Sequence, residues 1–422
     1  MHNKRGLQLL PFRGLRYAPS RVRSLAAVTS PPYDVVVRPE GKHHLETADP
    51  HNIVRLILPS GPDQAAATLR RWQEEGVLTP DDTPAVYVYE QRKDDTLQRG
   101  LIGALRLSEP AEGVVLPHEG VMEHIVQDRA ALMRAMAANP EPLLLSYVSD
   151  GRATGATAVV ERAAGRPPLL ATTTEDGVAH RLWAVTEAAE LAEIDADLAG
   201  RQALIADGHH RWATYLRLRD EHTGPGPWDY GLVLLVDTAR YPLQVKGIHR
   251  VLHRLPPDRA LTALKDAFRV REIDGPLSGA LDALTSTETE AEAGGAGNTA
   301  FVLAGDDRYH LLDRPDPALL ARTIPADRPA AWRTLDATVL HSTLLEHVWQ
   351  VPDQPAHISY LHDAQAAVAQ ARRHGGTAVL MRPVREEVVR ELARAGVTMP
   401  RKSTSFGPKP ATGLVLRSLR LD

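Results

Sequence analysis

The segment 203–218, ALIADGHHRWATYLRL, carries the strongest local signal in this sequence. Its first four residues form a short apolar run, which is typical of a buried strand. Large apolar side chains then recur at helical spacing from Trp212 to Leu218. Between the two lies DGHHR at 207–211, with a glycine where the chain must turn. The pattern predicts a strand, a tight turn and a helix in direct succession.

This turn has the residue types of an anion site. The first N–H groups of a helix are unpaired and lie at the positive end of its dipole, and Gly208 would let the backbone approach a phosphate. Arg211 would add a permanently charged, bidentate clamp. Asp207 is expected either to hold a metal ion or to accept a proton. The alternative is that Asp207 is only the N-cap, while His209 and His210 pack or face water.

Working outward, the rest of the chain alternates strand and helix patterns. We expect strands at 52–58, 86–89, 100–107, 143–148, 178–185 and 231–236, a hairpin at 300–312, and helices at 64–75, 128–138, 188–200, 338–349, 364–373 and 385–395. This alternation predicts an α+β fold in which helices pack against mixed sheets.

The length of 422 residues indicates two or three packed units. We predict an N-terminal α+β region at 1–150, a central region at 151–284 that carries the DGHHR turn, and a C-terminal α+β region at 300–422. The stretch 285–299, TSTETEAEAGGAGNT, contains no large apolar residue, and we expect it to be a flexible linker.

Composition excludes several classes of function. The sequence has no cysteine, which removes disulfides, thiolate nucleophiles, iron–sulfur clusters and cysteine-containing zinc sites. A net charge of −4 without basic blocks disfavours nucleic-acid binding. No run approaches the roughly 18 apolar residues that a membrane helix needs. We therefore expect a cytoplasmic protein that does not engage a membrane.

Two further loops carry candidate residues. LPHE at 116–119 places Glu119 beside His118 between a strand and a helix, where a carboxylate can act as a general base. SPPYD at 30–34 is a rigid turn that presents Tyr33 and Asp34. The alternatives are a solvated glutamate in the first loop and plain turn chemistry in the second.

A basic loop lies near the end of the sequence. It places Lys402, Ser403 and Thr404 close to Lys409, and such hydroxyls and ammonium groups suit a phosphate cradle. No Walker sequence GxxxxGK[ST] is present, so this is no P-loop of the ordinary kind. The alternative is a solvated basic loop.

Together these motifs resemble a known family. PFRGLRY at 11–17, SPPYDV at 30–35, LPHE at 116–119, DGHHR at 207–211 and the 399–410 segment, MPRKSTSFGPKP, are similar to the bacterial family catalogued as domain of unknown function one thousand and fifteen. The DGHHR turn also resembles that of free serine kinases with the ParB/sulfiredoxin-like fold. The resemblance therefore implies a ParB/sulfiredoxin-like nucleotide-binding core.

The kinase resemblance implies a set of roles for the site residues. Asp207, His209, His210 and Arg211 would surround the transferred phosphoryl group, and Glu119 would be the catalytic glutamate. Beyond this resemblance, the residue types lead us to expect phosphate or nucleotide to be bound by Gly208, Arg211, Lys402, Ser403, Thr404 and Lys409, and substrate by Arg13, Tyr33, Asp34 and His118. Expected cofactors are Mg²⁺, with Asp207 as its candidate ligand, and ATP or ADP.

The sequence thus favours phosphoryl transfer on a small hydroxylated metabolite, in the kinase or the phosphatase direction, with free serine or phosphoserine as the leading candidate. Such chemistry needs positioning and charge stabilisation more than a covalent nucleophile. The expected partner is a small phosphometabolite or a nucleotide. The rival hypothesis is a noncatalytic, nucleotide-dependent regulator that resembles ParB-like partition proteins, and the absence of basic blocks counts against it.

Overall fold

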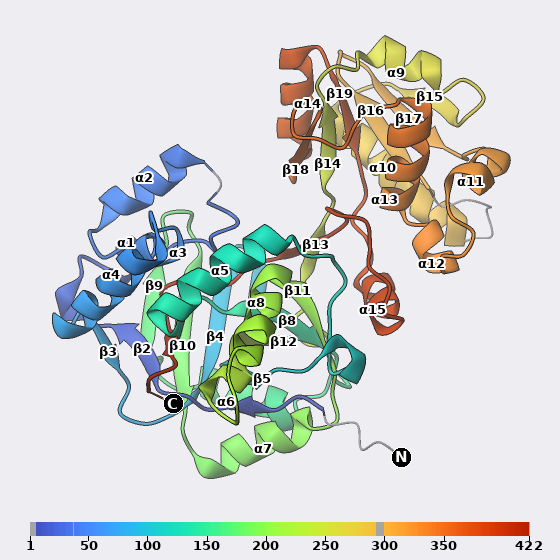
Figure 1. Cartoon of the computed structure of the whole chain (residues 1–422). Helices are drawn as coiled ribbons and strands as arrows, with labels where there is room; N and C mark the ends of the chain where they lie inside the picture. Colours follow the sequence, from blue (N-terminus) through green and yellow to red (C-terminus); the bar gives the residue numbers. More distant parts are fainter. Residues whose placement is uncertain (1–5, 37, 293–298, 422) are drawn as a thin grey trace. The chain divides into compact units, whose positions relative to one another are not determined.

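The computed structural model describes residues 6–36, 38–292 and 299–421 (Figure 1). The chain divides into two compact units, Met1–Leu243 together with Pro408–Asp422, and Gln244–Gly407. Both combine helices with mixed or antiparallel sheets, so the predicted α+β class is confirmed. The border between the units lies at 243, whereas the sequence predicts borders near 150 and 284. The last residues of the chain belong to the first unit, where Leu416 and Arg417 pair with Leu15 and Gly14.

The strands of the first unit form two sheets. They are β1 (Leu9–Leu10), β2 (Gly14–Tyr17), β3 (Leu78–Pro80), β4 (Val86–Lys93), β5 (Thr96–Arg106), β6 (Val115–Leu116), β7 (Ala138–Asn139), β8 (Leu143–Tyr147), β9 (Leu170–Thr173), β10 (Ala179–Val185), β11 (Ala203–Asp207), β12 (Tyr230–Asp237) and β21 (Leu416–Ser418). The larger sheet has the order β6-β11-β8-β12-β5-β4-β10-β9, with β1 also on β5. The smaller sheet has the order β3-β2-β21-β7.

The helices of the first unit cover these sheets (Figure 1). They are α1 (Leu25–Val28), α2 (Pro39–Ala48), α3 (Val54–Ile57), α4 (Pro62–Glu74), α5 (Glu123–Met136), α6 (Gly155–Ala164), α7 (Ala188–Leu198) and α8 (His209–Asp220), with short 3₁₀ turns at Pro19–Arg21, Pro110–Glu112 and Pro227–Asp229. Helix α5 packs against both α4 and α8. Its Leu132 and Met136 join Trp72 of α4 and Leu15 of β2 in one apolar cluster.

The second unit is a sheet with an apolar cluster on each face. Its strands are β13 (Gln244–Lys246), β14 (His249–Leu252), β15 (Arg269–Ile273), β16 (Phe301–Ala304), β17 (Tyr309–Asp313), β18 (Ile358–Leu361), β19 (Thr377–Leu380) and β20 (Ser405–Gly407). The main sheet has the order β15-β17-β16-β19-β14-β18, and β13 pairs with β20. The helices are α9 (Pro257–Ala263), α10 (Leu277–Glu292), α11 (Pro317–Thr323), α12 (Ala330–Arg333), α13 (Asp336–Thr338), the π-type helix η4 (Val339–Val348), α14 (Ala364–His374) and α15 (Glu386–Arg394).

Alternation along β16 explains these two clusters. Phe301 and Leu303 pack with residues of α9, α11 and η4, whereas Val302 and Ala304 pack with residues of α10 and α14. Successive side chains of a strand point to opposite faces, so a strand that is apolar at every position is buried on both. The run Phe301–Ala304 is such a strand.

Two local predictions were wrong. The strand predicted over 52–58 is the short helix α3, because the side-chain oxygen of Asn52 accepts the N–H of Val54 at 2.9 Å and starts a helical turn. The linker predicted over 285–299 is helical as far as Glu292, and residues 293–298 lie outside the described residues. Ala280 and Leu284 are buried and dock this helix on the sheet, so packing outweighs the weak apolar character of its last turns.

We expect Leu284→Ala to lower the free energy of unfolding of the second unit by about 2–4 kcal/mol, because it leaves a cavity beneath α10. Asp282→Ala on the exposed side of the same helix is the matched control and should change stability little. Urea unfolding followed by circular dichroism measures both. Equal, small effects of the two substitutions would contradict the docking of α10 through Leu284.

Candidate functional site

Strand β11 and helix α8 meet at Gly208, as the sequence predicts. Gly208 has φ +100° and ψ 31°, in the left-handed region, and forms the N-cap of α8. A Cβ atom here would lie 2.8 Å from Cγ of Leu143 on the neighbouring strand. Both the backbone angle and the space therefore demand glycine at this position. The turn fixes where Asp207 ends its strand and where the histidines begin their helix.

The carboxylate of Asp207 is held between two cations. Its Oδ2 lies 2.9 Å from Nη2 of Arg211, one turn into α8, and its Oδ1 lies 2.6 Å from Nζ of Lys409. Lys409 also contacts Oδ2 of Asp34 at 2.6 Å. Three segments that are distant in sequence therefore converge on one ammonium group. All four residues were expected in one site, but these direct ion pairs among them were not predicted.

Arg211 is not directed toward solvent. Its side chain is 1% exposed, its Nη1 lies 3.5 Å from Oε2 of Glu141, and the same nitrogen donates to the carbonyl of Pro142 at 3.2 Å. Burial acts to lower the pKa of Arg211, but Glu141 and Asp207 outweigh it and raise that pKa above its ordinary value. Nη1 and Nη2 are thus paired internally and orient Asp207, while the buried Nε has no hydrogen-bond acceptor within the described residues.

The ring of Tyr33 packs against the guanidinium of Arg211 and belongs to the same cluster. Its ring centroid lies 5.7 Å from Cζ of Arg211 and 4.4 Å from Cζ of Arg129, and its N–H donates to Glu141 at 3.3 Å. Burial raises the pKa of Tyr33 to about 12, so its hydroxyl is neutral at physiological pH. This residue packs between two cations.

The part of the cluster that water reaches is the pair of Lys409 and Asp34. Their side chains are 24% and 36% exposed, against 12% for Asp207. Burial opposes the charge on Lys409, but Asp207 and Asp34 raise its pKa to about 12. Burial likewise acts to raise the pKa of Asp34, yet Lys409 holds it below its ordinary value. A ligand that approaches this cluster therefore meets the Lys409 ammonium group together with the Asp34 carboxylate, which is the more exposed of the two.

The two histidines of the turn hold the loop that carries Glu119. The N–H of His118 donates to Nε2 of His209 at 3.2 Å, and the N–H of Met122 donates to Nε2 of His210 at 3.1 Å. Glu119, which is half-buried, lies between these two attachment points. The structure therefore brings the LPHE loop and the DGHHR turn together.

His209 and His118 are neutral groups in this arrangement. Their rings meet edge to face with centroids 4.4 Å apart, and both are buried. Burial lowers the pKa of His118 to about 3 and that of His209 well below its ordinary value. Because Nε2 of His209 accepts a hydrogen bond, its ring proton is on Nδ1. His209 thus positions the loop and offers no positive charge to a phosphate.

The remaining predicted residues have other partners or belong to the other unit. Nε of Arg13 donates to the carbonyl of Asp81 at 2.9 Å, at the end of β3. Lys402, Ser403 and Thr404 belong to the second unit. There Lys402 is exposed, while Ser403 is buried and its hydroxyl donates to the carbonyl of Pro400.

Sequence analysis missed Glu141 and Arg129. Glu141 is 2% exposed, and burial raises its pKa although Arg211 opposes that shift. Its Oε2 also accepts the hydroxyl of Thr412 at 3.4 Å. The flanking prolines of the sequence Asn-Pro-Glu-Pro at 139–142 signalled only the end of a helix. An acidic residue within a rigid, otherwise apolar turn was the available clue.

The described residues contain no group of three or more histidine, aspartate or glutamate side chains that could hold a metal ion. Asp207, the candidate ligand for Mg²⁺, has both oxygens paired with cations. As the side chains stand, they do not fit a metal site.

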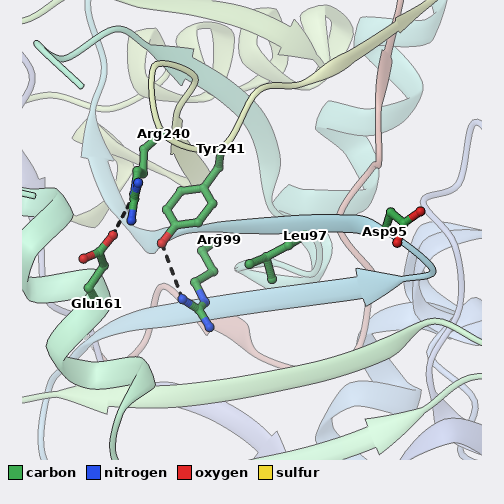
Figure 2. Close-up of a pocket in the computed structure, with 6 residues that line it drawn as sticks. All are labelled: Asp95, Leu97, Arg99, Glu161, Arg240 and Tyr241. Carbon is green, nitrogen blue, oxygen red and sulfur yellow. Dashed lines mark hydrogen bonds and ion pairs between the residues drawn. The ribbon is translucent and has the colours of Figure 1, made fainter. Parts of the chain in front are cut away.

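A separate hollow of about 470 Å³ lies on the hairpin of β4 and β5 (Figure 2). Its lining residues are Asp95, Leu97, Arg99, Glu161, Arg240 and Tyr241. Gln98 donates to the carbonyl of Pro408 at 3.2 Å, and side chains alternate along a strand, so Leu97 and Arg99 face away from the segment that carries Lys409. Arg99 pairs with Glu90 and Arg240 with Glu161, so this hollow holds balanced charges and none of the predicted site residues.

Comparisons with known proteins give a family but no activity. The family model described as Protein of unknown function (DUF1015) matches residues 9–338. No curated protein matches the sequence. Among the part of the chain that the structure describes, no helix is long and apolar enough to cross a membrane.

Similar solved structures share little sequence with this chain. A free serine kinase in complex with AMP is 16% identical, with 73% of this chain and 90% of that chain covered and a TM-score of 0.35. A conserved hypothetical protein from Pyrococcus furiosus is 16% identical, with 73% and 94% covered and a TM-score of 0.34. A C-terminally truncated SbnI from Staphylococcus aureus is 11% identical, with 76% and 89% covered and a TM-score of 0.34. Scores this low carry no inference about mechanism.

The buried histidines predict acid sensitivity. The folded state keeps His209 neutral, whereas the unfolded chain binds a proton on it below about pH 6.5. Stability should therefore fall as pH drops from 6.5 toward 4, by up to about 1.4 kcal/mol per pH unit for each such histidine. His209→Gln keeps an acceptor for the N–H of His118 and removes one of these protons, so its stability should depend less steeply on pH.

Urea unfolding at pH 7, 6 and 5 measures this slope. His43→Gln, at an exposed position on α2, is the control and should leave the slope unchanged. Identical slopes for the wild type and His209→Gln would mean that the folded protein protonates His209 as readily as the unfolded chain does.

Proposed function

This chain belongs to the family described as Protein of unknown function (DUF1015), and we propose that it transfers a phosphoryl group to or from the hydroxyl of a small metabolite. The favoured substrate is free serine in the kinase direction or phosphoserine in the phosphatase direction. ATP or ADP is the proposed phosphate donor. The DGHHR motif, which is similar to that of free serine kinases, supports this choice of substrate.

The observation that carries the proposal is the juxtaposition at the start of α8. The ammonium group of Lys409, whose side chain is 24% exposed, contacts Asp207 at the turn. The loop with Glu119 is hydrogen-bonded to His209 and His210 of the same turn. Phosphoryl transfer requires a cation for the phosphoryl oxygens and a group that handles the proton of the hydroxyl. Both are attached here to one rigid strand–helix junction.

Each residue then has a stated part in the reaction. Glu119 accepts the proton of the substrate hydroxyl while its oxygen forms a bond to phosphorus and the bond between phosphorus and the leaving nucleotide oxygen breaks. In the opposite direction, the phosphoryl group passes from phosphoserine to water or to ADP, and protonated Glu119 gives its proton to the leaving serine alkoxide. Lys409 neutralises phosphoryl oxygens, and Gly208 lets them approach the backbone.

The remaining residues act by position. Arg211 fixes Asp207, and His209 and His210 hold the loop of Glu119 in place. Asp34, which shares Lys409 in the structure, is the proposed partner for the ammonium group of an amino-acid substrate. The proposal derives no step through Mg²⁺, because both oxygens of Asp207 are already paired.

Glu119→Gln tests the proposed base. It preserves shape and hydrogen-bonding capacity but cannot accept the proton, so turnover should fall by roughly 10²- to 10⁴-fold with ligand affinity nearly intact. Phosphate or nucleotide release over a panel of phosphometabolites and hydroxyl acceptors gives turnover, and calorimetry gives affinity. Glu187→Gln, at an exposed position before α7, is the matched control and should retain full turnover.

Equal losses of binding and turnover in Glu119→Gln would instead mean a structural role for this side chain. No turnover by the wild type with any acceptor would contradict the proposal and favour a noncatalytic regulator. A gel shift at low salt then tests that rival class directly.

Lys409→Met tests the cation. Loss of a charged hydrogen bond, worth about 1.5–3 kcal/mol, should raise KM for the phosphate donor by about 10- to 100-fold. Lys93→Met, at an exposed position on the β4–β5 hairpin, is the control. Urea unfolding of both variants separates a binding defect from lost stability. An unchanged KM in a folded Lys409→Met protein would remove Lys409 from the site.

A further inference from the structure

The second unit contains a buried arginine that is unlike Arg211. Arg250, on β14, is fully buried, with an exposed fraction of 0%. No carboxylate lies within ion-pair distance of it among the residues that the structure describes. Burying a charge without a counter-charge is costly, and proteins usually pair such groups. This guanidinium therefore needs a physical explanation.

The hydrogen bonds of Arg250 go to neutral acceptors. Nη1 donates to the carbonyl of Ile248 and to the sulfur of Met381, the latter at 3.1 Å. Nη2 donates to Nε2 of His341 at 3.1 Å and to the carbonyl of Lys402 at 2.9 Å. The remaining donor, Nε–H, is buried and has no acceptor within the described residues. Four of the five N–H groups of Arg250 thus have a hydrogen-bond acceptor, but no negative charge in the part of the chain that the structure describes neutralises the guanidinium.

Electrostatics around Arg250 are correspondingly positive. Burial lowers the pKa of Arg250 to about 10, and burial together with Arg250 lowers the pKa of His341 to about 4. The acidic group nearby is Asp353, which accepts the hydroxyl of Tyr360 and has its Oδ2 3.9 Å from Nδ1 of His341. Its side chain is 42% exposed, so water screens much of its charge. Asp353 is thus an incomplete counter-ion.

The same guanidinium organises the basic loop. Its bond to the carbonyl of Lys402 holds that residue at φ +57°, in the left-handed region. The side chains of Lys402 and of its neighbour Arg401 are exposed. His341 accepts through Nε2, so its proton is on Nδ1, which remains able to donate. The buried positive charge of Arg250 is thus accompanied by the exposed cations Arg401 and Lys402. The N–H of the His341 ring is a further donor.

We propose that this loop, Arg401–Thr404, and His341 form a binding site for a phosphate-type oxyanion in the second unit, with Arg250 as its buried positive charge. The oxyanion would accept hydrogen bonds from Nζ of Lys402 and from Nδ1–H of His341. It would supply the counter-charge that Arg250 lacks. Free phosphate and the phosphate groups of a nucleotide share this chemistry. This site stands independently of the phosphoryl transfer proposed for the first unit.

The test measures binding of inorganic phosphate and of ADP by calorimetry, with the whole chain at constant ionic strength. All proteins carry Lys409→Met, so that the candidate site of the first unit does not contribute. In this background, Lys402→Asn should raise the Kd for phosphate by about 10-fold, the effect of one lost charged hydrogen bond. The substitution keeps the backbone carbonyl that Arg250 uses, and asparagine tolerates the left-handed backbone. Lys265→Asn, at an exposed position of the same unit, is the matched control.

Thermal unfolding supplies a second readout that does not depend on Lys402. Phosphate should raise the Tm of the protein with Arg250 intact and should fail to do so in Arg250→Met. Asp353→Asn, which removes the incomplete counter-ion, should tighten phosphate binding. If Arg250→Met does not fold, the Lys402→Asn and Asp353→Asn arms still decide the matter.

If the protein binds both phosphate and ADP, and Lys402→Asn weakens both, the site exists and accepts either the free anion or the phosphate groups of a nucleotide. Binding of phosphate alone with the same dependence would support a site for the free anion. Absence of phosphate binding, or a Kd equal in the Lys402→Asn and Lys265→Asn proteins, would overturn the proposal. None of these outcomes depends on turnover by the first unit.

Discussion

The ion pair between buried Arg211 and its carboxylates is the constraint on which the first unit depends. Asp207 comes from the end of β11, Glu141 from the segment between β7 and β8, and both contact a guanidinium that is 1% exposed. Loss of either carboxylate would leave charge uncompensated in a medium of low dielectric constant, at a cost of about 3–5 kcal/mol. Chain segments distant in sequence are therefore obliged to meet at this point, and the Tyr33 turn and Lys409 join them there.

The same constraint decides which groups remain for a ligand. A guanidinium that is enclosed by carboxylates has little capacity left for a phosphate, whereas Lys409 keeps about a quarter of its side chain in contact with water. His209 follows the same logic, because its buried ring accepts a backbone N–H and burial lowers its pKa. Within the DGHHR turn, the residues that first suggest phosphate binding thus serve mainly to position others. In the proposed site, the charge for a ligand would instead come from Lys409, about two hundred residues away in sequence.

Local sequence patterns predicted the parts of the fold that depend on local periodicity. The strand–turn–helix unit at 203–220 and the hairpin of β4 and β5 follow from apolar spacing and turn residues. The strand expected at 52–58 failed because one side-chain hydrogen bond from Asn52 starts a helix. Glu141 and Arg250 could not be found from sequence, since Glu141 acts through Arg211 and Arg250 through His341. Both partners are distant in the chain, and no local pattern encodes such pairings.

Arg211 and Arg250 show why burial alone does not reveal what a cation does. Both guanidinium groups are excluded from water, yet the pKa of the first is raised and the pKa of the second is lowered. The difference lies in the surroundings, since carboxylates surround Arg211 while carbonyls, a thioether and a neutral imidazole surround Arg250. A buried cation that is paired with carboxylates, such as Arg211, stabilises the fold and attracts a further anion only weakly. An uncompensated one leaves a positive potential at the nearest surface, and an anion that binds there gains the attraction that the fold itself leaves unused.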